Sequence, residues 1–306
     1  MLIFFVSHKE LEIYHKNYQI KASLKIPANK CSRLGVLLSH GGIINRQSLI
    51  RTNYSFADYL CDELDAYIIV PDLQGETIHK NGTSYNNFSK ILNIVSEYFT
   101  ETYNLEEVFG FGHSMGCFVL VQALQEDDYI SSIVNYGGPI RELKVTRQKR
   151  FFDYLVRYLS DYDYNLNIRN LLKYIFDDET CMYLEDVMLK EEEYNSSTYD
   201  FNLDSSLFMD LKKIIDDYIN YIKEWNKPAL LLFGTEDGVT RKTIKFYKDN
   251  SVDDNIIFKH IQGASHVTPC MSSHYQLSKL EPIISFYKQI YRIDDFQKIL
   301  AGKRHP

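Results

Sequence analysis

Short apolar runs alternate with segments of helical periodicity over the first 136 residues. The runs are apolar at consecutive positions, which is typical of strands buried on both faces of a parallel sheet. The pattern predicts a β-hairpin over 10–27, strands over 34–40, 66–72, 107–112 and 131–136, and helices over 54–64 and 86–100. Strands that alternate with helices in this way indicate an α/β fold, a mostly parallel sheet flanked by helices.

This alternation stops after residues 137–139, which read Gly-Gly-Pro. Residues 140–225 carry helical periodicity and no convincing buried strand, and the strand pattern returns at Ala229. A chain of 306 residues with 45% hydrophobic residues can bury one large core and carry an insertion. We therefore expect an α/β core formed by residues 1–139 and 226–306, and a helical cap formed by residues 140–225 and inserted after the sixth strand.

One serine stands between two glycines in the segment Gly112-His113-Ser114-Met115-Gly116, behind a predicted strand and ahead of an apolar helix. A sharp turn from strand to helix strains its central residue and requires very small residues two positions to either side. The turn would expose the Ser114 hydroxyl. It would also place the Met115 amide at a helix N-terminus, where the amide can stabilise an oxyanion. The pattern predicts a nucleophile at Ser114.

A nucleophilic serine needs a general base, and the base needs an acid that orients it. Asp237 follows the predicted buried strand that starts at Ala229. His266 lies in a loop of small residues after a further predicted strand, over 255–262. The order serine, acid, histidine along the chain is one in which such triads occur. We expect Asp237 to be the acid and His266 the base.

Both assignments have competitors. Glu236 is adjacent to Asp237, and an acid after a strand could instead cap the next helix. His274 follows His266 closely and is its main rival. Three other histidines have other places in the pattern. His113 lies in the turn beside Ser114, His260 lies within the predicted strand 255–262, and His40 lies where strand 34–40 passes into the next loop.

Four motifs in chain order resemble the α/β-hydrolase superfamily, and within it the capped esterases, monoacylglycerol-lipase-like enzymes and serine aminopeptidases. The motifs span nearly the whole chain and read Leu38-Ser39-His40-Gly41-Gly42, Gly112-His113-Ser114-Met115-Gly116, Phe233-Gly234-Thr235-Glu236-Asp237 and Gly263-Ala264-Ser265-His266. The resemblance implies an oxyanion hole formed by the amides of Met115 and Gly42. It also implies that the cap lies over the nucleophile and roofs the substrate pocket.

Some residues differ from those of related proteins, and they disfavour particular activities. Ile43 and Ile44 replace the Pro-Gly of the loop that proline-directed aminopeptidases carry, which disfavours that activity. Gln74 replaces the arginine of a related Asp-x-Arg-Gly turn, so we interpret Asp72 as a residue that fixes a loop by hydrogen bonds. Haloalkane and epoxide hydrolysis use a carboxylate nucleophile, and Ser114 argues against both.

These residues predict a serine hydrolase that cleaves a small-molecule carboxylic ester through an acyl-enzyme intermediate. A thioesterase or acyltransferase that acts on an acyl carrier substrate would use the same residues. A ligand receptor that keeps the triad without turnover is a further alternative from another class. The predicted chemistry requires no metal ion and no organic cofactor. An acyl carrier and a second copy of the chain both stay open as partners.

The net charge, the cysteines and residues 1–10 indicate which partners and which location to expect. The net charge of −7 argues against nucleic acid as the main partner, because phosphate binding needs a basic surface. The five cysteines are odd in number and lack the spacing of a disulfide framework or metal site. Residues 1–6 are apolar without a basic lead, and polar residues follow at 7–10, which predicts neither a signal peptide nor a membrane span. We expect a cytoplasmic protein with reduced thiols.

Overall fold

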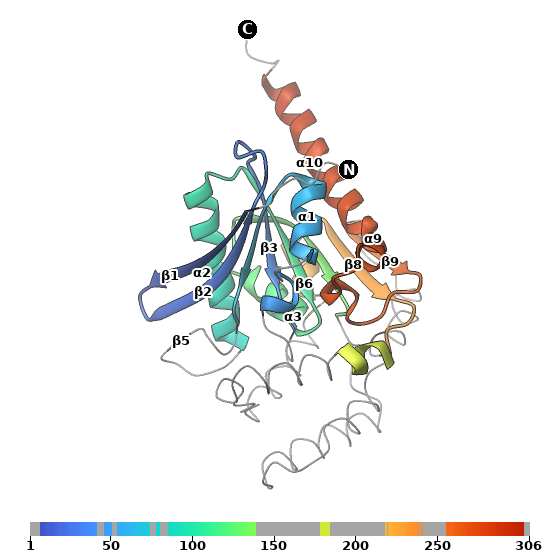
Figure 1. The fold of residues 1–306 in the computed structure, drawn as a ribbon. Helices are drawn as coiled ribbons and strands as arrows, with labels where there is room; N and C mark the ends of the chain where they lie inside the picture. Colours follow the sequence, from blue (N-terminus) through green and yellow to red (C-terminus); the bar gives the residue numbers. More distant parts are fainter. Residues whose placement is uncertain are drawn as a thin grey trace.

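The computed structural model describes residues 7–41, 46–50, 54–73, 78–79, 85–138, 178–183, 218, 220–238, 240 and 255–302. Its strands are β1 (Ser7–His15), β2 (Tyr18–Ile26), β3 (Leu34–Ser39), β4 (Tyr67–Pro71), β5 (Ile78–His79), β6 (Glu107–His113), β7 (Ile130–Tyr136), β8 (Ala229–Gly234) and β9 (Ile256–Ile261). They form one sheet in the order β1-β2-β4-β3-β6-β7-β8-β9, and β5 pairs with β2 (Figure 1).

The sheet is parallel from β4 to β9 along this order. Strands β1 and β2 form the predicted antiparallel hairpin, and β2 runs antiparallel to β4. Helices α1 (Phe56–Leu64), α2 (Tyr85–Tyr103) and α3 (Met115–Ala123) connect the parallel strands. The predicted strands and helices of this half are therefore confirmed, with small differences at their ends.

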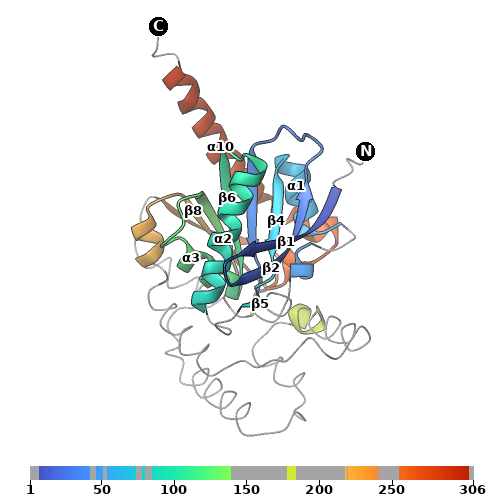
Figure 2. The same ribbon diagram turned by 90° about the vertical axis from the view of Figure 1, so that its left-hand side faces the viewer.

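Helices cover both faces of the sheet (Figures 1 and 2). Helices α2 and α3 pack on one face, and α1, α9 (His274–Ser278) and α10 (Glu281–Gly302) pack on the other. Successive residues of β3 alternate between the two cores: Val36 and Leu38 pack with α1, whereas Leu37 packs with α2. Because both faces are buried, the central strands are mostly apolar.

The start of α1 differs from the predicted start for a local reason. The predicted helix begins at residue 54, but α1 begins at Phe56 because Ser55 caps it. The Ser55 hydroxyl accepts a hydrogen bond from the Asp58 amide at 3.2 Å, and the Asp58 carboxylate accepts one from the Ser55 amide at 2.8 Å. This reciprocal pair satisfies two donors of the helix start.

The chain changes direction within the sheet between β3 and β6. After β3 it passes through α1 to β4 on one side, and after β4 it passes through α2 to β6 on the other side of β3. Such a switch point leaves a crevice at the carboxyl ends of the two strands. The segments after β3 and β6, which carry His40 and Ser114, are thereby brought together.

The predicted cap lies almost entirely outside the described residues. Within it, residues 178–183 and 220–225 are helical. Tyr218 and Ile222 are fully buried in the core that α2 and α3 share. The predicted sixth strand is β7, and the helical cap after it, with its boundaries at 140 and 225, stays a prediction.

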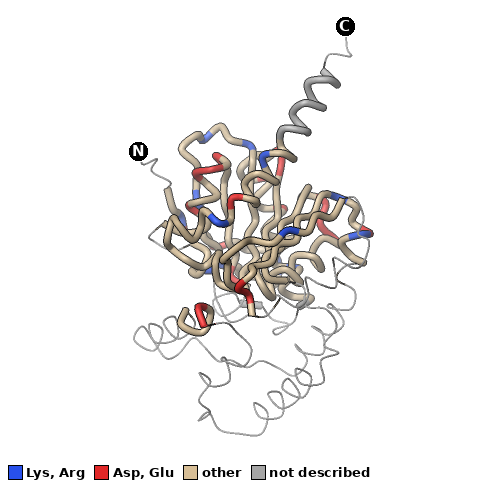
Figure 3. Tube along the Cα trace, turned by 90° about the vertical axis from the view of Figure 1, so that its right-hand side faces the viewer, with Lys and Arg blue, Asp and Glu red and all other residues tan. Residues whose placement is uncertain are grey.

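Charges of both signs are interspersed over the described part of the chain (Figure 3), and the view shows no face where Lys and Arg alone gather. None of the described helices is long and apolar enough to cross a membrane. All five cysteines belong to the described residues, and none of them forms a disulfide bond.

Candidate active site

Ser114 occupies a strained turn between β6 and α3. Its backbone angles are φ 53° and ψ −120°, in a region that residues with a side chain rarely adopt. A Cβ atom at Gly116 would lie 2.1 Å from the backbone oxygen of Ser39, and one at Gly112 would lie 2.7 Å from the Cα of Cys117. Because backbone atoms cannot yield, both positions require glycine, as the sequence pattern indicated.

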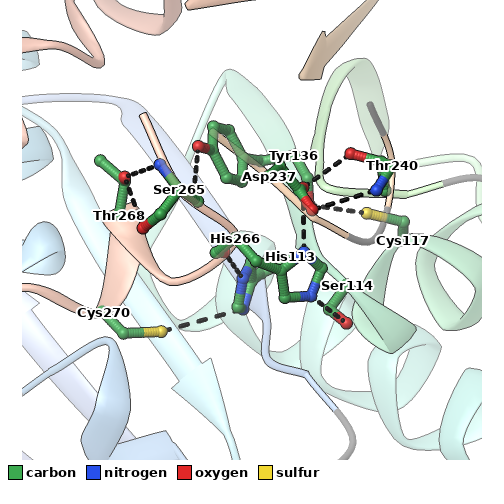
Figure 4. Close-up of polar contacts among 10 residues, drawn as sticks. All are labelled: His113, Ser114, Cys117, Tyr136, Asp237, Thr240, Ser265, His266, Thr268 and Cys270. Atoms are coloured by element: carbon green, nitrogen blue, oxygen red, sulfur yellow. Dashed lines mark hydrogen bonds and ion pairs between the residues drawn. The ribbon is translucent and has the colours of Figure 1, made fainter. Parts of the chain in front are cut away.

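The structure brings Ser114, His266 and Asp237 together in one line of contacts (Figure 4). The Nδ1 atom of His266 lies 3.0 Å from Asp237 Oδ2, and its Nε2 atom lies 2.9 Å from Ser114 Oγ. A carboxylate only accepts hydrogen bonds, so Nδ1 carries the hydrogen and Nε2 accepts one from the Ser114 hydroxyl. His266 is therefore oriented to take up the proton of Ser114.

Asp237 is completely buried. Its Oδ2 atom accepts a hydrogen bond from the Thr240 hydroxyl at 2.6 Å, and its Oδ1 atom accepts one from the Thr240 amide at 3.0 Å. Burial by itself raises the pKa of Asp237, but the attraction of His266 and the hydrogen bonds from His266 and Thr240 outweigh it and lower the pKa below its usual value. Asp237 is thus a carboxylate at neutral pH.

The competitors named from the sequence lie elsewhere. Glu236 is exposed, and its backbone amide donates to the oxygen of Ala264. His274 begins the surface helix α9 and stacks on Tyr54, with ring centroids 5.7 Å apart. Asp237 does accept from an amide three residues ahead, as a capping acid would, but its second oxygen contacts His266.

Of the two predicted oxyanion donors, only Met115 lies among the described residues. Met115 is the first residue of α3, so its amide belongs to the turn where the helix dipole favours negative charge. Gly42 lies outside the described residues, and Gly41 before it is buried. The Nδ1 atom of His40 donates to the oxygen of Gly41 at 2.8 Å, while its Nε2 atom accepts from the Leu73 amide at 3.1 Å. His40 therefore holds the start of this loop against the segment after β4.

Asp72 has the hydrogen bonds expected of a residue that fixes a loop. Its Oδ2 atom accepts from Nη1 of Arg46 at 2.9 Å, and both side chains are buried. Arg46 comes from the short helix η1 (Arg46–Ser48), just after the predicted oxyanion loop. An arginine thus contacts Asp72 although Gln74 stands in the expected arginine position of the turn.

Sequence reasoning missed four residues that surround the triad: Thr240, Gly137, His113 and Tyr136. Thr240 holds Asp237, and its spacing of three residues after an acid is a local signal that could have identified it. Gly137 has φ +67°, and a Cβ atom there would lie 3.0 Å from the His266 ring. The roles of His113 and Tyr136 have no local signal, because their partners lie in the His266 loop.

His113 is a buried neutral histidine beneath His266. Its ring centroid lies 5.3 Å from that of His266, and its Nε2 atom lies 2.8 Å from the backbone oxygen of His266. Since that oxygen only accepts, Nε2 carries the hydrogen. Burial, reinforced by repulsion from His266, lowers the pKa of His113 from 6.5 to about 3. His113 therefore adds no positive charge beside His266 at neutral pH.

His113 is expected to make the protein sensitive to mild acid. Between pH 6.5 and about 3 the unfolded chain binds a proton that the folded His113 excludes, so its contribution to stability falls as the pH falls. The contribution changes by about 1.4 kcal/mol per pH unit, or about 2 kcal/mol from pH 7 to pH 5. Denaturant unfolding of the native protein and of His113→Gln at both pH values measures this difference.

The variant His274→Gln is the matched control, because His274 is an exposed histidine. It should keep the acid sensitivity of the native protein. Equal loss of stability in native protein and His113→Gln would contradict the prediction.

No protein-family model and no curated protein sequence matches the chain. Solved structures do match it. The highly thermostable carboxyl esterase from Bacillus coagulans is 15% identical with a TM-score of 0.64, over 94% of this chain and 99% of its own. A thermophilic esterase from Thermogutta terrifontis is 15% identical with a TM-score of 0.63, over 94% and 98%. A bromoperoxidase from Bacillus anthracis is 18% identical with a TM-score of 0.61, over 92% and 100%.

These likenesses extend over nearly the full length of each chain. They concern the fold alone, because sequence identities of 15% to 18% are too low to transfer an activity. The predicted fold class is confirmed: this chain has the α/β-hydrolase fold.

Proposed function

We propose that this protein is a serine hydrolase that cleaves a carboxylic ester through an acyl-enzyme intermediate. The observation that carries the proposal is the unbroken line of hydrogen bonds from Ser114 through His266 to the buried Asp237, at 2.9 and 3.0 Å. The strained backbone of Ser114 supports it further, because strain of this kind is kept where it serves a function. Esterases among the matched structures agree with an ester substrate.

The proposed reaction has two halves. Ser114 Oγ attacks the carbonyl carbon while His266 Nε2 takes its proton, and Asp237 stabilises the resulting imidazolium. The amides of Met115 and Gly42 would donate hydrogen bonds to the oxyanion. His266 then donates its proton to the leaving alcohol, and water releases the acyl group with His266 as base. These steps need neither a metal ion nor an organic cofactor.

A fluorophosphonate probe tests the proposal, because it reacts covalently only with an activated serine. Intact mass should show a single adduct on the native protein and none on Ser114→Ala. The variant Ser273→Ala, at a serine beside α9, should be labelled like the native protein. No adduct on the native protein would contradict an activated Ser114 and would favour a ligand receptor.

Turnover of matched substrates tests the acyl class. An ester and a thioester with the same acyl group are compared at equal concentration, and we expect faster hydrolysis of the ester. Faster cleavage of the thioester would replace the ester proposal with a thioesterase acting through the same Ser114.

A further inference from the structure

Four successive carbonyl groups in the loop that carries His266 each accept a hydrogen bond from a different part of the fold. This loop follows β9 and is called the base loop here, residues 263–266. The donors are Lys279 Nζ to Gly263 at 2.5 Å, the Glu236 amide to Ala264 at 3.0 Å, the Tyr136 hydroxyl to Ser265 at 2.6 Å and His113 Nε2 to His266 at 2.8 Å. The Ser265 carbonyl also accepts from the Thr268 amide at 3.3 Å, and the Ser265 amide donates to the Thr268 hydroxyl at 2.9 Å. The base loop is therefore fixed by this short turn and, in addition, from several other parts of the fold.

Two of these donors also contact the nucleophile. His113 is the residue directly before Ser114 in the chain. Tyr136 accepts a hydrogen bond from the Ser114 amide at 2.9 Å with its backbone oxygen, while its hydroxyl donates to Ser265. Each of these residues thus joins the backbone of Ser114 to the backbone of the base loop (Figure 4).

The environment of His113 holds its ring in one orientation. Its Nε2 atom donates to the His266 oxygen, so the Nδ1 atom of the neutral ring is the acceptor that faces the Cys270 thiol, 3.9 Å away. The side chains of His113, Tyr136 and Cys270 are almost completely buried. Loss of the His113 or Tyr136 donor is unfavourable in this buried setting, and a movement of the base loop can relieve that cost.

We propose that His113 and Tyr136 are positioning residues that set the distance between the Ser114 hydroxyl and the His266 imidazole. They act through the Ser265 and His266 carbonyls, and the ring of His113 also packs against the His266 ring, with centroids 5.3 Å apart. The inference rests on the proposed function for its catalytic consequence. Its structural content, that these two hydrogen bonds orient the His266 ring on Asp237, holds independently of any substrate.

Matched substitutions separate the hydrogen bond from the bulk of the side chain. His113→Met introduces an apolar side chain of similar size and removes the donor to His266. His113→Gln offers an amide nitrogen near the position of Nε2 and keeps the donor. Tyr136→Phe removes only the hydroxyl. Lys279→Met is the control, because Lys279 holds the base loop at Gly263 without contacting the Ser114 backbone.

The first readout is proton NMR of the Nδ1 hydrogen of His266, which a hydrogen bond to Asp237 moves far downfield. We expect this resonance in the native protein, in His113→Gln and in Lys279→Met, and its loss or shift in His113→Met and Tyr136→Phe. An unchanged resonance in both of the latter would overturn the inference. So would its absence from the native protein, because the ring would then not be held on Asp237.

The second readout is steady-state ester hydrolysis. His113→Met and Tyr136→Phe should lower kcat on the order of 10-fold to 100-fold with little change in KM, since a displacement of about 1 Å at the reacting groups costs up to 10²-fold. His113→Gln should recover most of the rate. Native kcat in both His113→Met and Tyr136→Phe would overturn the catalytic consequence. A native protein that keeps the NMR signal but cleaves no ester would instead refute only the proposed function.

Discussion

Alanine in place of Ser114 or His266 is expected to lower kcat for ester hydrolysis on the order of 10⁵-fold to 10⁶-fold. Without Ser114 no acyl-enzyme forms, and without His266 the imidazole that lies 2.9 Å from Ser114 Oγ and takes its proton is lost. Because the two residues act as one unit, the double variant should be no slower than either single variant. Active-site concentrations and initial rates with one ester give kcat for all three proteins.

His274→Ala is the matched control for this prediction. His274 lies eight positions after His266 (274 − 266) but stacks on Tyr54 at the surface. Its removal should leave kcat within about twofold of the native value, as for a surface substitution away from the site. Full turnover by Ser114→Ala would contradict the triad, and losses in the double variant that multiply would contradict a shared step.

Asparagine in place of Asp237 is expected to lower kcat by about 10⁴-fold with the fold retained. The carboxylate accepts from Nδ1 of His266 and so leaves Nε2 as the acceptor for the Ser114 hydroxyl. The Thr240 amide donates to one carboxylate oxygen and the Thr240 hydroxyl to the other. An asparagine would place its NH₂ group, which only donates, opposite one of these two donors. The His266 ring would then favour the tautomer that cannot take up the Ser114 proton.

Glu236→Gln is the matched control for Asp237→Asn. It makes the same chemical change one residue earlier, on an exposed side chain. Its kcat should stay near the native value, while circular dichroism and melting temperature confirm that both variants fold. Comparable losses in the two variants would mean that the acid of the site is not specifically Asp237.

Much of the architecture followed from local pattern. The central strands β3, β4, β6 and β8 are buried on both faces, so they are mostly apolar and easy to recognise. The two-residue strand β5 and the five-residue helix α9 are too short to show a period. No local signal links helix α10 to the sheet, although its Tyr287 packs on β6 and donates to the Gly110 oxygen at 2.8 Å.

Some residues of the candidate site could likewise be predicted from local sequence, and others could not. The elbow could be predicted because its demand for small residues is met within five positions, at Gly112 and Gly116. The candidates Asp237 and His266 followed from their places after strands, since the carboxyl ends of parallel strands meet at one edge of the sheet. The pairing of Asp72 with Arg46 could not be predicted, because a side-chain donor can reach a buried acid from any neighbouring loop.

The sequence by itself determined the alternating elements, the strained turn at Ser114 and the order of the candidate triad. These features depend on backbone sterics and on burial, which act over a few neighbouring residues. Only the tertiary structure decided that His113 and Tyr136 hold the loop of His266. Those hydrogen bonds join residues 129 and 153 positions apart, and their geometry exists only once the sheet has brought its strands side by side.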